Sequence, residues 1–65
     1  MTDAERTATI AIILAECCGA YTICNAVNVA HRLGYAISEI GSARFISAVD
    51  AARNAREAKE EGIAA

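Results

Sequence analysis

The sequence predicts a small all-α protein, and three observations carry this prediction. None of the 65 residues is proline and 16 are alanine, the residue with the highest helix propensity. The apolar fraction is 55% and the charged fraction 22%, a balance that argues against a disordered chain. A chain of this length forms a single domain. We therefore expect one helical domain over residues 1–65, built as a small three-helix bundle.

The first helix is expected from about Asp3 to Cys18. Thr2 and Glu5 have the spacing of a capping box, in which each side chain bonds the other residue's backbone amide. The segment 10–14 is apolar on nearly all sides, so we expect the helix to be buried on more than one side.

The second helix is expected from about Ile23 to Leu33. Gly19 can adopt the left-handed conformation that ends a helix, and Thr22 can cap the next one. One continuous helix that tolerates Gly19, at a cost of about 1 kcal/mol, is the alternative. Gly34 follows as a terminator of the second helix.

The last helical stretch is expected from Ala36 to about Glu61. It is either one helix or a short helix joined to a longer one at Gly41, where Ser42 could cap the new start. Gly62 is expected to end it. Alanines between residues 48 and 58 leave room for close helix approach.

The apolar surplus predicts a homodimer. A domain of about 60 residues buries only about 60% of its unfolded surface and is marginally stable alone. We expect the first helix and the alanine-rich last helix to seal a two-fold interface. The expected interface residues are Ile10, Ile13, Leu14, Cys17, Phe45, Val49 and Ala52.

No pattern in the sequence points to catalysis, and no cofactor is expected. Cys17, Cys24 and His31 would lie seven residues apart on a continuous helix, about 10.5 Å per step, which is too far for shared zinc coordination. Cysteines as small buried hydrophobic residues indicate a reducing, cytoplasmic environment.

A membrane span is considered for residues 7–31, where the one formal charge is Glu16. An ionisable group in the middle of a span costs about 2.5–3.5 kcal/mol. The basic region of a signal peptide is also missing at the start. We therefore prefer a buried dimer core as the explanation for this apolar segment, with a membrane span as the minor alternative.

Residues 26–45 resemble the helix-turn-helix pattern. Ala30 is the small residue within the first helix, Gly34 the glycine of the turn, and Ile40 the branched residue that closes the small core. The resemblance implies a helix-turn-helix-like fold in the middle of the chain and a second helix that reads DNA bases. The residues that would contact DNA or another partner are Arg32, Tyr35, Ser38, Ser42, Arg44 and Arg53.

Two residues depart from this pattern. Glu39 would face the phosphates of DNA unfavourably, and Gly41 weakens the second helix. The resemblance therefore supports the fold more than it supports DNA binding.

The first functional hypothesis is a small non-catalytic regulator or inhibitor that binds another protein, of the kind encoded by phages or mobile elements. A net charge of −2 and a pI near 5.2 are unusual for a nucleic-acid binder. The alternative is a helix-turn-helix transcriptional regulator that binds DNA. The expected partners are a second copy of the chain and a protein target, with DNA in the alternative.

Overall fold

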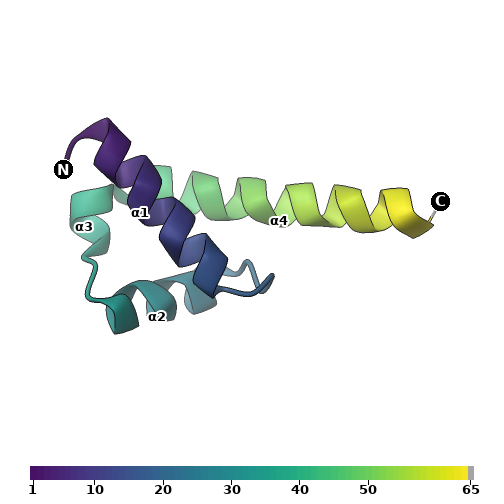
Figure 1. Cartoon of the computed structure of the whole chain (residues 1–65), viewed down its shortest axis with the longest axis horizontal. Helices are drawn as coiled ribbons and strands as arrows, with labels where there is room; N and C mark the ends of the chain where they lie inside the picture. The colour runs from purple at the N-terminus through teal and green to yellow at the C-terminus, as the bar shows by residue number, and fades with distance from the viewer. Residues whose placement is uncertain (65) are drawn as a thin grey trace.

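The computed structural model describes the backbone of residues 1–64 and the side chains of residues 1–60. In this part of the chain there are four α-helices and no strand, which confirms the all-α prediction (Figure 1). The expected three-helix count differs because Gly41 separates a one-turn helix from the long last one. The helices are α1 (Asp3–Glu16), α2 (Ile23–Leu33), α3 (Ile37–Ile40) and α4 (Ser42–Ala64).

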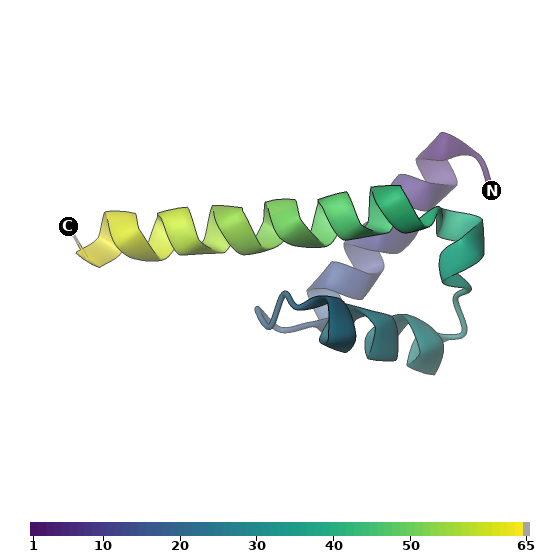
Figure 2. The same ribbon diagram turned by 180° about the vertical axis from the view of Figure 1, so that it is seen from behind.

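Helix α1 crosses the pair formed by α2 and α4 and packs against both. Figure 1 shows α1 in front of this pair, and the view from behind in Figure 2 shows it at the back. The molecule measures 41 × 22 × 16 Å along its principal axes. Its long dimension follows α4, whose 23 residues span about 34 Å. The C-terminal part of α4 therefore extends beyond the other helices.

The start of α1 has the predicted capping box. The Glu5 amide donates to the Thr2 hydroxyl at 3.1 Å, and the Thr2 amide donates to the Glu5 carboxylate at 3.1 Å. The helix ends at Glu16 rather than at Cys18, because Cys18 adopts a positive φ of 54°. With Gly19 at φ 87°, the chain turns here, and the expected break is confirmed.

Both ends of α2 lie where the sequence places them. The Thr22 hydroxyl accepts a hydrogen bond from the Asn25 amide at 3.2 Å. At the other end Gly34 has φ 86° and ψ 18°, and the Tyr35 amide bonds back to the carbonyl of Ala30 at 2.9 Å. This is the hydrogen-bond pattern of a helix ended by a left-handed glycine.

Gly41 forms a sharp joint between α3 and α4. Its φ of 97° and ψ of 114° lie outside the region that residues with a side chain adopt readily. The Gly41 carbonyl accepts from the Phe45 amide at 2.9 Å, which places Ser42 inside α4 rather than at a cap before it. Helix α4 also continues through Gly62, where the sequence analysis expected it to end.

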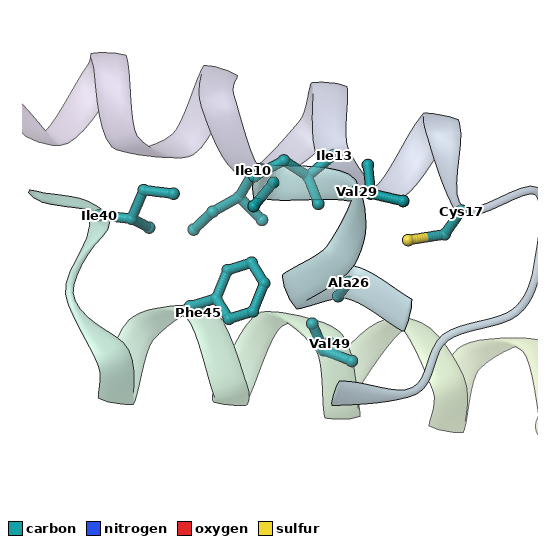
Figure 3. Close-up of a cluster of buried hydrophobic side chains, with 9 residues drawn as sticks. Ile10, Ile13, Cys17, Ala26, Val29, Ile40, Phe45 and Val49 are labelled. Carbon is teal, nitrogen blue, oxygen red and sulfur yellow. The ribbon is translucent and has the colours of Figure 1, made fainter. Parts of the chain in front are cut away.

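The core lies where α1, α2, α3 and the first half of α4 meet (Figure 3). Phe45 and Val49 of α4 project toward Ile13 of α1, and Ile40 closes the end of the cluster. Every buried side-chain nitrogen or oxygen of the described residues has a hydrogen-bond partner. The complete core is Ile10, Ile13, Cys17, Ala26, Val29, Ala30, Ile40, Phe45 and Val49.

Asp3 joins the start of α1 to the start of α4. Its carboxylate lies 3.1 Å from the Arg6 guanidinium and 3.2 Å from that of Arg44. Arg6 also donates to the Glu39 carbonyl of α3 at 3.2 Å. These exposed polar contacts fix the register between three helix ends but contribute little stability each.

Candidate protein-binding surface

Most of the expected dimer-interface residues lie inside the single chain. Ile10, Ile13, Cys17, Phe45 and Val49 are at most 7% exposed. They cannot reach a second chain in this conformation, because α1 and α4 of the same chain pack against each other. The remaining two, Leu14 and Ala52, are half-buried.

The opposite side of α1 carries an exposed face with no charge. Ala4, Ala8, Ala11 and Ala15 follow one another at intervals of four, three and four residues, which places them along one side of the helix. Ile12 lies beside them and is 47% exposed. We call these five residues the α1 outer face. An uncovered apolar surface on a small domain marks a binding site more often than an isolated exposed side chain does.

Acidic residues border the α1 outer face. Glu5 and Glu16, both exposed, lie eleven residues apart on the same side of the helix, next to Ile12. The hydrogen bonds from the Thr2 amide and hydroxyl hold the pKa of Glu5 below its ordinary value, so it is ionised at neutral pH. The basic side chain of α1, Arg6, is directed instead toward Asp3 and α3. The surface therefore combines an apolar centre with a negative border.

Of the three residues that carry the helix-turn-helix resemblance, two are buried and one lies in a turn. Ala30 is fully buried, Gly34 has a positive φ, and Ile40 is buried against the core. The helix that would read DNA differs from the pattern, because α3 has only four residues and Gly41 ends it. A helix of one turn cannot lie along a DNA groove as a recognition helix does.

The expected partner-contact residues come from α2, α3, α4 and the loop after α2. Arg44 is paired with Asp3 at 3.2 Å, and Arg53 with Asp50 at 3.5 Å. Ser38 and Ser42 are exposed on α3 and at the start of α4, whereas Tyr35 is half-buried against the core. Arg32 is exposed near the end of α2.

The three cysteines occupy different environments. Cys17 lies in the core, where burial and the neighbouring Cys18 raise the pKa of its thiol. Cys18 and Cys24 are exposed, which differs from the expectation that all three cysteines are buried. Among the described residues, no three His, Cys, Asp or Glu side chains come together in a way that could hold a metal ion.

The residues of the α1 outer face were not identified from the sequence, because residues 10–14 are apolar on nearly all sides of the helix. The spacing of the alanines contained the signal. Ile10, Ile13 and Cys17 follow one side of the helix, whereas Ala4, Ala8, Ala11 and Ala15 follow the other. Which side faces the core depends on α2 and α4, which come later in the chain.

Within residues 1–64, none of the helices combines the length and apolar composition that a membrane crossing requires. Comparison of the chain with family models, with curated proteins and with solved structures finds no match in any of the three.

Proposed function

We propose that this chain is a small non-catalytic regulator or inhibitor that binds another protein through the α1 outer face. The observation that carries the proposal is the uncharged, solvent-exposed side of α1, centred on Ile12. Alanines allow a second helix to approach closely, and a protruding isoleucine supplies an apolar anchor. A helix of the target protein is the partner element that fits this shape.

The acidic border specifies the chemistry of this partner. Glu5 and Glu16 favour a target helix whose apolar side is flanked by lysine or arginine. Two copies of α1 would instead bring carboxylates together, since a parallel pair places Glu5 beside Glu5 and an antiparallel pair places Glu5 beside Glu16. The α1 outer face therefore suits a basic target better than a second copy of itself.

The test is capture of a stoichiometric protein partner from a nuclease-treated lysate of the source organism. Ile12→Glu places a charge in the centre of the α1 outer face and should abolish capture. The matched control is Ile46→Glu, because Ile46 of α4 is 44% exposed and lies outside this face. Capture that survives Ile12→Glu, or recovery of nucleic acid alone, would contradict the proposal.

Homodimerisation stays a prediction. Because most of the expected interface residues are buried within one chain, a dimer would have to use other surface residues. Light scattering at micromolar concentration measures it directly. A monodisperse species of 6.8 kDa would contradict a dimer. It would leave the protein-binding proposal intact.

DNA binding is the second candidate. Its support is the helix-turn-helix resemblance of the sequence, together with the burial of Ala30 and Ile40 and the positive φ of Gly34. This candidate predicts a gel shift at low salt that weakens steeply as salt is added, since phosphate contacts release counterions. It also predicts loss of the shift in Arg44→Ala. The short α3 and the Arg44–Asp3 ion pair favour protein binding instead.

A further inference from the structure

A groove of about 350 Å³ lies between the α1–α2 loop and the middle of α4. Its volume is at the lower end of the range typical of small-ligand sites. Two alanines keep the α4 side of the groove shallow, and an aromatic ring and two cationic side chains complete its walls. The lining residues are Tyr21, Ala52, Ala55, Arg56 and Lys59.

Arg56 is held in place on two sides. Its Nε donates to the Glu60 carboxylate at 3.0 Å, one turn further along α4. Its guanidinium also lies directly against Gly19, since a Cβ atom added to this glycine would overlap it. Gly19 has φ 87° and follows the end of α1, where the partial negative charge of a helix C-terminus attracts a cation. The guanidinium is therefore positioned at the groove before any ligand arrives.

The charges around the groove indicate the charge of the ligand. Arg56 and Lys59 contribute two positive charges, and Glu60 offsets one of them. The remaining single positive charge matches a monoanion. An arginine fork beside an ammonium is a common recognition pair for carboxylates.

The apolar walls indicate the body of the ligand. Ala52, Ala55 and the half-buried ring of Tyr21 offer no charge, and an aromatic ring packs favourably against another ring and against methyl groups. We infer that this groove binds a monoanionic carboxylate carried on an aromatic body, with the carboxylate on Arg56 and Lys59 and the ring beside Tyr21. This site is separate from the α1 outer face and does not depend on the function proposed for that face.

The test is a titration of the full-length, isotope-labelled protein followed by amide NMR, with benzoate as the probe. Benzoate should shift the Gly19, Ala52 and Ala55 resonances along saturable curves, with a Kd of about 1 mM. Gly34 and Gly41 lie away from the groove and serve as internal references. Benzamide, the neutral isostere, and sulfate, an anion without an apolar body, should produce much smaller shifts.

Two variants with the same total charge test the assignment of the cation. Lys59→Gln should weaken benzoate binding about tenfold, because it removes a charge-assisted contact. Arg53→Gln removes one positive charge from the same helix but outside the groove, and binding should stay close to wild type. Unchanged Gly34 and Gly41 resonances verify folding in both.

Four results would overturn the inference. If benzamide produced shifts equal to those of benzoate, the groove would not recognise the negative charge. If sulfate did so, the groove would not recognise the aromatic ring. A benzoate titration that leaves Gly19 unmoved, or equal weakening by Lys59→Gln and Arg53→Gln, would show that the anion does not bind in this groove.

Discussion

At the residue scale, the three cysteines provide a direct test of the core. Burial keeps Cys17 protonated and shielded, whereas Cys18 and Cys24 face solvent. Because the thiolate is the reactive form, we expect two thiols per chain to react quickly with Ellman's reagent in the native protein. The third should react only as the protein unfolds. Three equally fast thiols would place Cys17 outside the core.

The capping box predicts a dependence of stability on pH. The pKa of Glu5 is lowered in the folded state, so its contribution is fully present above the ordinary carboxyl pKa and is lost as the pH falls through the lowered value. Glu5→Gln, which mimics the protonated side chain, should therefore be less stable than wild type at neutral pH. The difference in melting temperature should shrink in acid. Parallel melting curves at every pH would contradict this assignment.

The structural roles that depend on nearby residues were predictable from the sequence. Thr2 with Glu5, Thr22 and Gly34 act through hydrogen bonds to amides or carbonyls within five residues, and all were placed correctly. The burial of Ile13 inside its own chain, rather than in a dimer interface, was not predicted. It depends on Phe45 and Val49, more than thirty residues later. The same long-range contact removed most of the expected dimer interface from the surface.

At the element scale, two glycines end helices in different ways. Gly34 has left-handed dihedrals and open space where a Cβ would lie, so Gly34→Ala should cost about 1–2 kcal/mol through the backbone alone. Gly41, with ψ 114°, lies outside the left-handed region, and Gly41→Ala should cost more. Urea denaturation of the two variants measures the order. A smaller loss for Gly41→Ala would contradict it.

The joint at Gly41 bears on the helix-turn-helix resemblance, because it ends α3 after a single turn. Ala30 and Ile40, to which the resemblance assigns packing roles, are both buried in the core. A recognition helix needs several exposed turns, and α3 has one. The end of the short helix at Gly41 could be predicted from the sequence. The direction in which α4 continues after Gly41 could not.

The candidate groove could not be predicted from the sequence. Tyr21 comes from a loop, and Ala52, Ala55, Arg56 and Lys59 come from a helix that begins 21 residues later. Read alone, the Arg56–Glu60 pair is an ordinary solvated contact on a helix surface. The α1–α2 turn at Gly19 gives it a second role, because the turn brings the loop to the side of α4.

At the scale of the whole molecule, a core of nine side chains supports the fold. A domain of this size has about 3–5 kcal/mol of stability, and removing a buried phenylalanine side chain costs about the same amount. Phe45→Ala should therefore leave the chain largely unfolded at room temperature by circular dichroism. Ile46→Ala, at the exposed neighbouring position, should change stability by no more than about 0.5 kcal/mol. Similar losses in the two variants would contradict the core.

Helix α4 passes from the core into solvent without a break. We therefore expect its two halves to differ in amide hydrogen exchange. Phe45 and Val49 anchor the first half of α4 in the core, whereas residues 53–60 are exposed and approach the α1–α2 loop where Arg56 lies against Gly19. Amides of the first segment should exchange with deuterium only when the whole domain opens, and those of residues 56–60 by local fraying. One continuous helix thus contains both slowly and rapidly exchanging amides. The boundary between exchange by global opening and exchange by local fraying falls beside the groove.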